Sequence, residues 1–238
     1  MGCSSSKTLE FNKKSKKKEI SSSTSFSSIN NQVKTTEFGK YVGPLKNDKM
    51  EGKGIFYWTN DDRYEGDFKN DIREGKGKYF YKNGNRYEGD FKENQFNGNG
   101  IFFWNNGDKY EGQFKNDAME GKGIYYYLNG EKYEGDYKND IREGKGTFYW
   151  NNGNKYVGQY KNDMREGKGI LYYKNGNRYE GEFKGGAFEG NGKIFFSNGD
   201  IYEGKFKADK LHGKGIFYYK GGKKEKREYQ EDLLISHE

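Results

Sequence analysis

Eight Tyr-x-Gly triplets follow one another in this chain at a constant spacing of 23 residues. A period of this length without slippage indicates a repeat architecture, in which each unit buries its apolar surface against its neighbours. The chain is 31% hydrophobic and 33% charged, but its 18% of aromatic residues favours a folded array over disorder. The triplets begin at Tyr41, Tyr64, Tyr87, Tyr110, Tyr133, Tyr156, Tyr179 and Tyr202.

One unit, residues 64–86, reads YEGDFKNDIREGKGKYFYKNGNR. Its first strand, YEGDF, is expected to place its Tyr, Gly and Phe on one face of a sheet. The segment KNDIREGKG is interpreted as a polar loop, and Lys78 to Tyr81 as the second strand. Asn83-Gly84 then predicts a hairpin turn. The unit therefore predicts an all-β fold, an antiparallel β-meander of hairpins.

The pattern YEGDF…EGKG…NG resembles the MORN repeat over eight units, from Tyr41 to about Lys224. The resemblance implies an elongated, twisted, single-layer β-meander. Two strands per unit at ~4.8 Å spacing would give a rod of roughly 75 Å. The first unit departs from the pattern at Leu45 and Asp61, where other units have an aromatic residue and the turn glycine. The domains expected are a disordered tail (1–36), the repeats (37–224) and a C-terminal tail or cap (225–238).

The second strands usually carry three consecutive aromatic residues, although a strand with one buried face should alternate. A three-residue loop at Asn83-Gly84 would pair Tyr79 with Tyr87 and turn the middle aromatic residue away from the core. A two-residue turn would exchange the faces. The resemblance favours the three-residue loop.

The middle aromatic residues would then form a second stripe, which we expect to bind a partner or a second copy of the chain. The alternative is that these rings only shield the backbone and pack on neighbouring lysine stems. The partner-binding residues are Tyr57, Phe80, Phe103, Tyr126, Tyr149, Tyr172, Phe195 and Tyr218. Aliphatic residues two positions earlier extend the stripe, namely Ile55, Ile101, Ile124, Ile170 and Ile216.

The net charge of +7 is concentrated in residues 1–36, which hold seven Lys and two Glu. In the repeats, a Lys follows each first strand and an acidic row lies on the outward side of those strands. We interpret the two rows as cross-strand charge pairs, with phosphoinositide binding as the alternative. The acidic row would oppose flat docking on an anionic bilayer. The lysines are Lys46, Lys69, Lys92, Lys115, Lys138, Lys161, Lys184 and Lys207.

The sequence begins MGCSSSK, which fits the template for N-myristoylation, with Gly2 as the acceptor and Ser6 at the hydroxyl position. Cys3, the single cysteine, is a candidate for palmitoylation. One myristoyl chain binds membranes only marginally, whereas a second chain and nearby lysines make attachment stable. The polybasic cluster is Lys13, Lys14, Lys16, Lys17 and Lys18. We therefore expect the tail to tether the chain to the anionic inner leaflet, on the cytoplasmic face of the plasma membrane.

The sequence gives little support to an enzyme. It contains no P-loop and no dinucleotide fingerprint, and its two histidines, His212 and His237, are isolated. We expect no cofactor and no metal. Nucleic-acid binding is also disfavoured, because the repeats are nearly neutral and phosphate contacts dominate such affinity.

After Gly222 the repeat pattern ends, and a short helix is predicted at Lys224–Leu234 to cover the last hairpin. An uncovered edge strand would instead favour an end-to-end homodimer. The chain is expected to be a non-enzymatic scaffold that links a membrane to cytoskeletal or signalling proteins. The alternatives are a structural component of the cilium or cell cortex, and a phosphoinositide-binding regulator of a lipid kinase.

Overall fold

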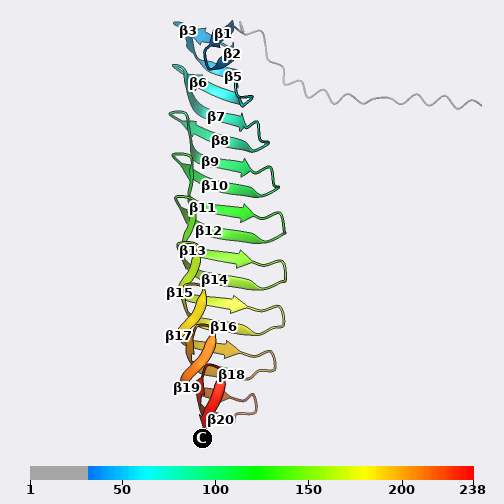
Figure 1. Ribbon diagram of the computed structural model, residues 1–238, viewed down its shortest axis with the longest axis vertical. Coiled ribbons are helices and arrows are strands. Elements are labelled where there is room, and N and C mark those ends of the chain that lie inside the picture. Colours follow the sequence, from blue (N-terminus) through cyan, green and yellow to red (C-terminus); the bar gives the residue numbers. More distant parts are fainter. Residues whose placement is uncertain (1–31) are drawn as a thin grey trace, which may run out of the picture.

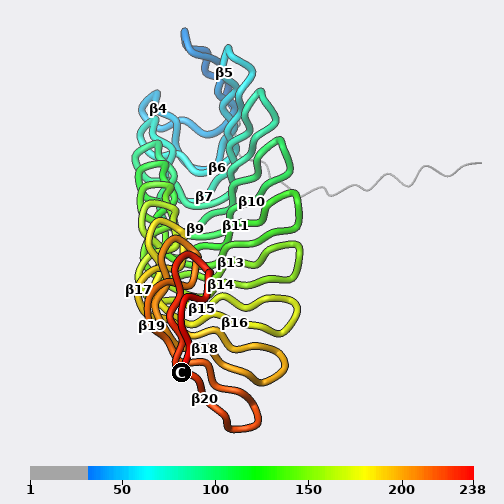
Figure 2. Tube along the Cα trace, turned by 60° about the horizontal axis from the view of Figure 1, so that its bottom comes forward, coloured from blue at the N-terminus to red at the C-terminus, as the bar shows by residue number. Residues whose placement is uncertain are grey.

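The computed structural model describes residues 32–238, which form a long rod of stacked β-strands without a helix (Figure 1). Nineteen strands make one open sheet, and a separate small hairpin, β3–β4, lies in the first unit. Strand β1 pairs with β2, β2 pairs with β5, and each later strand pairs antiparallel with the next, so the units follow one another along the rod in chain order (Figure 2). The expected all-β antiparallel meander is confirmed.

The strands of the first units are β1 (Gln32–Thr36), β2 (Gly39–Gly43), β3 (Leu45–Lys46), β4 (Lys49–Met50), β5 (Gly52–Trp58), β6 (Arg63–Lys69), β7 (Ile72–Phe80), β8 (Arg86–Lys92), β9 (Gln95–Phe103), β10 (Lys109–Lys115) and β11 (Ala118–Tyr126). The later strands are β12 (Lys132–Lys138), β13 (Ile141–Tyr149), β14 (Lys155–Lys161), β15 (Met164–Tyr172), β16 (Arg178–Lys184), β17 (Ala187–Phe195), β18 (Ile201–Lys207), β19 (Lys210–Tyr218), β20 (Lys224–Gln230) and β21 (Leu233–His237).

The segment predicted as a polar loop is mostly strand. Only Asn70 and Asp71 form the turn between β6 and β7, with φ angles of 50° and 67°. Two consecutive residues with positive φ make a tight hairpin turn whose twist matches that of the strands, and Asn and Asp tolerate it. The strand then runs from Ile72, and Gly75, with φ of 77°, lies where the register of the pair shifts. The prediction was wrong because the Asn-Asp turn was not recognised.

The second turn of each unit follows the prediction from Asn-Gly. The Tyr81 nitrogen donates to the Asn85 oxygen at 3.0 Å, so three residues form the loop, with Gly84 at a φ of 89°. This loop pairs Tyr79 with Tyr87. The three-residue alternative is therefore confirmed, and it assigns the two faces of the sheet.

The inner face is built around a tyrosine that lies across two glycines. The ring of Tyr64 occupies the space that side chains at Gly66 and Gly77 would need. Its hydroxyl donates a hydrogen bond to the Asp67 carbonyl at 3.0 Å. Burial raises the pKa of the Tyr64 hydroxyl well above its ordinary value, which keeps the donor protonated. Only glycine permits so close an approach of the ring to the backbone.

These tyrosines join the units into one core. Tyr64 packs edge-to-face on Phe68 of its own unit, at 5.0 Å between centroids, and on Phe91 of the next unit, at 4.8 Å. Edge-to-face pairs of this kind are favourable beyond their area burial. The equivalent tyrosine in every unit is almost completely buried. These tyrosines are Tyr41, Tyr64, Tyr87, Tyr110, Tyr133, Tyr156, Tyr179 and Tyr202. The core is therefore a continuous aromatic column along the rod.

The two ends of the described chain differ from expectation. Residues 32–36, assigned from sequence to a disordered tail, form β1 on the edge of β2. Their sequence, QVKTT, contains β-branched residues that suit a strand. Residues 1–31 lie outside the part of the chain that the structure describes.

The helix predicted at Lys224–Leu234 is wrong, because the meander continues through β20 and β21. Glu231 and Asp232 form the same kind of turn as Asn70-Asp71, with φ angles of 51° and 70°. Tyr229 is buried and packs against Tyr202 at 5.6 Å. A strand forms here despite the helix propensity of these residues, because β19 presents a free edge whose backbone groups need hydrogen-bond partners. In addition, Tyr229 follows the buried Phe206 by 23 residues and so continues the core.

A cluster of ions replaces the missing tyrosine of this last half-unit. Glu225, at the repeat position of the core tyrosine, accepts hydrogen bonds from the Tyr219 hydroxyl and from Arg227. Bonds from Lys223, Arg227 and Tyr219 lower the pKa of Glu225 from 4.5 to about 2. Because this pKa is lower in the folded chain than in the unfolded chain, its contribution to stability is present above pH 4.5 and is lost as the pH falls toward 2.

We therefore expect Glu225→Gln to lower the thermal unfolding midpoint at neutral pH, with a smaller effect near pH 2, where the wild-type carboxylate is protonated. Thermal melts of both proteins across the acid range measure the difference between their midpoints. A difference that stays constant with pH would contradict this assignment.

Candidate interaction surface

The eight aromatic residues of the predicted second stripe lie on the outer face of the sheet, opposite the buried tyrosines. Phe80, for example, is half-buried on this face, whereas its neighbours Tyr79 and Tyr81 pack against the core. The most exposed ring is that of Tyr57, at 41%. The location predicted for the stripe is confirmed, and its role as a binding surface stays a prediction.

A cation from a neighbouring first strand covers most of these rings. Phe80 lies in register between Arg63 on β6 and Arg86 on β8. The Arg63 guanidinium is 4.3 Å from the centroid of the Phe80 ring. Six rings of the stripe have such a cation at 3.7 to 4.5 Å, namely Phe80, Phe103, Tyr126, Tyr149, Tyr172 and Phe195. We call this alternation of cations and rings the cation–aromatic ladder.

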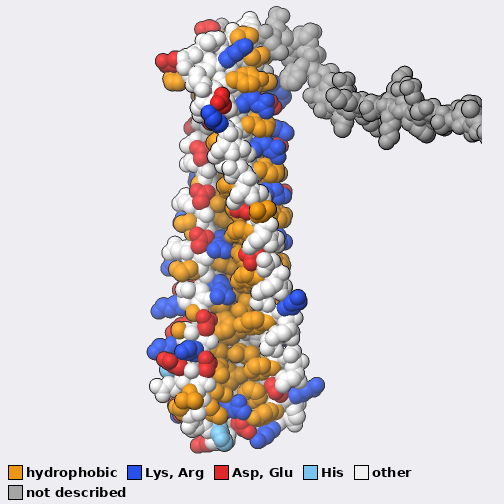
Figure 3. Space-filling view, turned by 45° about the vertical axis from the view of Figure 1, so that its right-hand side comes forward, with side chains coloured by type: hydrophobic (Ala, Val, Ile, Leu, Met, Phe, Trp, Pro, Cys, Tyr) orange, Lys and Arg blue, Asp and Glu red, His pale blue; other side chains and the backbone are white. Residues whose placement is uncertain are grey.

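Figure 3 shows hydrophobic side chains in a band along the rod, with Lys and Arg side chains beside it. Each contact between a cation and an exposed ring contributes about 0.5–1 kcal/mol. The ladder therefore stabilises the sheet, as the alternative interpretation of the stripe expected, while leaving edges of the rings accessible. The stripe is consequently amphipathic rather than purely apolar.

A second row on the outer face alternates acidic and aliphatic residues in most units, with Lys78, Thr147 and Lys193 in place of the aliphatic residue in three of them. Glu111 lies between Ile101 on β9 and Ile124 on β11. The glutamates of this row pair with the ladder cations two residues earlier on the same strand, as in Lys109–Glu111 at 3.2 Å. The same pairing occurs at Arg63–Glu65, Arg86–Glu88, Lys132–Glu134 and Arg178–Glu180. Most ladder cations are therefore neutralised.

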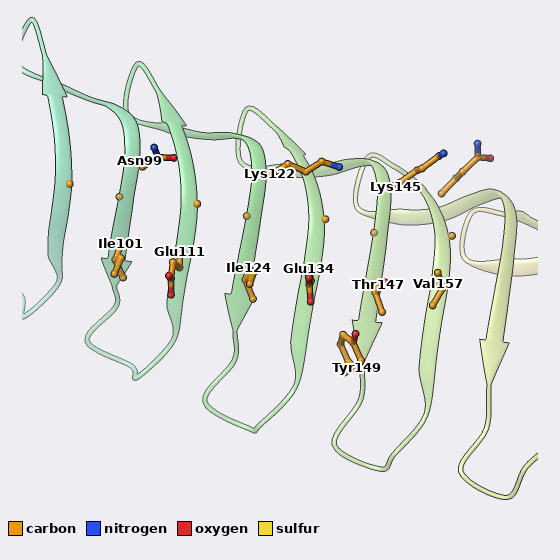
Figure 4. A pocket seen from close by; sticks show the side chains of 18 of the residues that line it. Asn99, Ile101, Glu111, Lys122, Ile124, Glu134, Lys145, Thr147, Tyr149 and Val157 are labelled. Atoms are coloured by element: carbon orange, nitrogen blue, oxygen red, sulfur yellow. The ribbon is translucent and has the colours of Figure 1, made fainter.

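An open groove runs along the outer face, with the paired glycines as its floor (Figure 4). Ile101, Glu111 and Ile124 line one side, and Asn99 and Lys122 lie across the glycine backbone from them. A second groove continues along later units and shares Val157 and Lys168 with the first. Backbone groups, aliphatic side chains and charges therefore meet along one line.

The lysines that pair across strands are not those that the sequence indicated. Asp67 and Asp90 bind Lys53 and Lys76, at 2.9 and 2.5 Å, and these lysines come from the segment predicted as a loop. Within residues 32–238, none of the eight lysines that follow the first strands forms a salt bridge. Charge pairing across the strands is thus present, but with different cations.

The proposed lipidation residues Gly2 and Cys3 and the polybasic cluster lie outside the described residues. In residues 32–238 no group of three His, Cys, Asp or Glu side chains is placed to hold a metal ion. No helix in this part of the chain could cross a lipid bilayer.

Comparison with protein families decides which family the repeats represent. The model of the MORN repeat matches residues 39–63, 64–86, 87–109, 110–132, 133–155, 156–178, 179–201 and 202–224. The chain belongs to the MORN-repeat family. The eight units and their phase agree with the resemblance seen in the sequence. No curated protein sequence matches the chain significantly.

Solved structures share the fold of this MORN-repeat chain at low sequence identity. The wild-type TCP10 domain of Danio rerio CPAP has a TM-score of 0.50 and 10% identity, covering 87% of this chain and 99% of that domain. The same domain in complex with a peptide of Danio rerio STIL has a TM-score of 0.50 and 11% identity, covering 87% and 98%. The likeness is one of fold.

Sequence reasoning found the rings of the ladder but missed its cations. Phe80 and Arg86 are six residues apart, so the three-residue loop already implied that they face each other. The pairing of Arg63 with Phe80 was hidden, because it depends on the Asn70-Asp71 turn that was interpreted as a loop. The turn signal Asn-Asp could have revealed it.

Proposed function

We propose that this MORN-repeat protein is a non-enzymatic scaffold, anchored by N-terminal acylation to the cytoplasmic face of the plasma membrane, that holds cytoskeletal or signalling proteins on the outer face of its rod. The observation that carries the proposal is MGCSSSK followed by the polybasic cluster of residues 13–18. Two acyl chains and several lysines act together where one chain would be marginal.

The form of the rod supports a scaffold. Its sheet presents the cation–aromatic ladder and the groove repeatedly along its length, on the face that the core does not use. Extended repeat arrays characteristically serve as binding surfaces of this kind. A partner held along the rod would stay close to the membrane to which the tail is attached.

We expect Gly2→Ala to reduce the membrane-bound fraction by about tenfold or more, because loss of myristoylation also removes the context for acylation of Cys3. Cys3→Ser should leave one chain and give intermediate binding. Metabolic labelling with an alkyne-bearing myristate, followed by fractionation of cells that express each variant, measures both effects. Ser5→Ala is a matched control in the same segment and should behave as wild type.

Wild-type chains that carry no acyl group by mass spectrometry would overturn the proposal of an anchor. If Gly2→Ala leaves the membrane but still sediments with a detergent-resistant cytoskeleton, the cilium or cortex alternative is favoured. Binding of the isolated repeats to phosphoinositide vesicles would favour the regulator of a lipid kinase.

A further inference from the structure

Three consecutive strands, β13, β14 and β15, interrupt the charge pattern of the outer face. At the acidic positions of β14 the chain has Val157 and Gln159. The same two positions hold Glu134 and Asp136 on β12. Each of the three strands carries three residues on the outer face, beside the glycine at its centre. They face each other in register except Lys168, which lies in a bulge opposite Gln159 and donates its backbone nitrogen to the Gln159 side-chain oxygen at 3.0 Å. The residues are Lys145, Thr147 and Tyr149, then Lys155, Val157 and Gln159, then Lys168, Ile170 and Tyr172.

Two features of this area, the lysine patch, depart from the units on either side of it. First, Lys155 lies over the Tyr172 ring at 4.5 Å like other ladder cations, but Val157 stands where its glutamate partner would be. Second, Lys145 is opposite Gln159, whereas the equivalent Lys122 binds Asp136. Within the described residues, no salt bridge involves Lys145 or Lys155. Their charges are therefore available to a ligand.

Carboxylates near the patch already hold ion-pair or hydrogen-bond partners. Asp136 on β12 binds Lys122 and accepts a hydrogen bond from the Lys145 backbone nitrogen at 2.9 Å. Glu143 on β13 accepts a hydrogen bond from the Asn162 nitrogen at 3.1 Å. Glu166 on β15 accepts one from the Gly185 nitrogen at 2.9 Å. Lys168 faces Glu182 in register, but the two form no salt bridge. The patch thus keeps a local excess of positive charge.

The centre of the patch is apolar and open. Thr147, Val157 and Ile170 lie side by side across the three strands. Val157 is 38% exposed and lines both grooves, so it stands where they meet. Figure 4 shows Thr147 and Val157 on one side of the glycine line and Lys145 on the other. An aliphatic ligand group on Val157 would therefore have lysines on both sides.

We propose that the lysine patch binds an extended acidic peptide segment of a partner, with an aliphatic side chain on Val157 and carboxylates at Lys145, Lys155 and Lys168. This inference deepens the proposed function, and rests on it for the idea that the rod holds a protein partner. Glu134 and Glu180 bound the patch four strand spacings apart, roughly 19 Å, which is the length of about six extended residues. An extended peptide can enter the grooves that meet at Val157, whereas a flat bilayer cannot follow them, so the shape of the surface favours a peptide over a membrane.

The test replaces Val157 by Glu, which six of the other units have at this position. Val157→Glu should fold normally, because Glu is accommodated there in neighbouring units, and it should neutralise Lys155. The matched control is Val157→Thr, which is β-branched and uncharged. The probe is a fluorescein-labelled six-residue peptide of Asp and Glu with two central leucines. Its binding is measured by fluorescence anisotropy with full-length protein from bacteria, which lacks acyl groups.

Wild type and Val157→Thr should bind the peptide with similar affinity, and Val157→Glu should bind about tenfold more weakly. Binding should also weaken as salt is added. No saturable binding by wild type, or equal binding by Val157→Glu with an unchanged circular dichroism spectrum, would overturn the proposal. The proposal would also be overturned if wild type bound phosphatidylserine vesicles but not the peptide, and if Val157→Glu abolished the binding to vesicles. Because the protein is unacylated, these results do not depend on the membrane anchor.

Discussion

Gly192→Ala should destabilise the rod by roughly 3 kcal/mol, as expected for overpacking in a rigid core. An added Cβ at Gly192 would lie 2.5 Å from Cε2 and 2.6 Å from the hydroxyl oxygen of Tyr179. The Tyr179 ring cannot withdraw easily, because it is completely buried, donates a hydrogen bond to the Glu182 carbonyl at 2.9 Å and packs on Phe206 of the next unit. The urea unfolding midpoint followed by circular dichroism measures the loss.

Gly221→Ala is the matched control, because no atom lies within 4 Å of its added Cβ and its φ is not in the left-handed region. This substitution should change the midpoint little. Equal stability of Gly192→Ala and Gly221→Ala would contradict the view that the tyrosine lying over paired glycines holds each unit together.

The fold was largely predictable because the 23-residue period, the glycines and the Asn-Gly turn all act locally. The loop at Asn83-Gly84 sets the register of Tyr79 against Tyr87, and that register alone assigns the core face. The tight turn at Asn70-Asp71 was not predicted. Its polar residues and the nearby Gly75 are typical of a loop, and the turn type that Asn-Asp favours was not considered. The error left half of each second strand unassigned.

The candidate surface was predictable only in part. The aromatic stripe follows from the register of one hairpin, but the groove and the lysine patch depend on both hairpins of several units. Val157 and Gln159 are visible in the sequence as departures from Glu and Asp. Their significance appears only when Lys145 and Lys155 are placed in register beside them. The end of the array was mispredicted because helix propensity in residues 224–234 ignores the free edge of β19.

Asp117→Ala should lower stability by roughly 2 kcal/mol, since it combines a lost hydrogen bond to a carboxylate with an alanine in the left-handed region. Asp117 has a φ of 67° in its turn. Its nitrogen donates to the Phe96 carbonyl at 3.1 Å, and its side chain accepts from the Phe96 nitrogen at 2.8 Å. The two bonds connect the turn of one unit to the second strand of the preceding unit. Urea unfolding again measures the effect.

Asp117→Asn is the matched control, because Asn94 occupies the equivalent position one unit earlier, with a φ of 68°, and accepts the Arg73 nitrogen at 2.8 Å. It should be nearly as stable as wild type. An Asn variant as unstable as the Ala variant would show that charge, rather than the acceptor and the backbone conformation, is what matters.

The chain itself contains a unit with only part of this connection. Gly186 occupies the corresponding turn position of the seventh unit. Its nitrogen donates to the Arg165 carbonyl at 2.9 Å, and its carbonyl also accepts a hydrogen bond from the Arg165 guanidinium, but it has no side chain to accept a hydrogen bond from the Arg165 backbone nitrogen. In a linear array each unit is stabilised mainly by its nearest neighbours, so losing one such bond weakens one junction rather than the whole rod. The junction between the sixth and seventh units is therefore where local opening should begin. Asp117→Ala would create a second such point, between the third and fourth units.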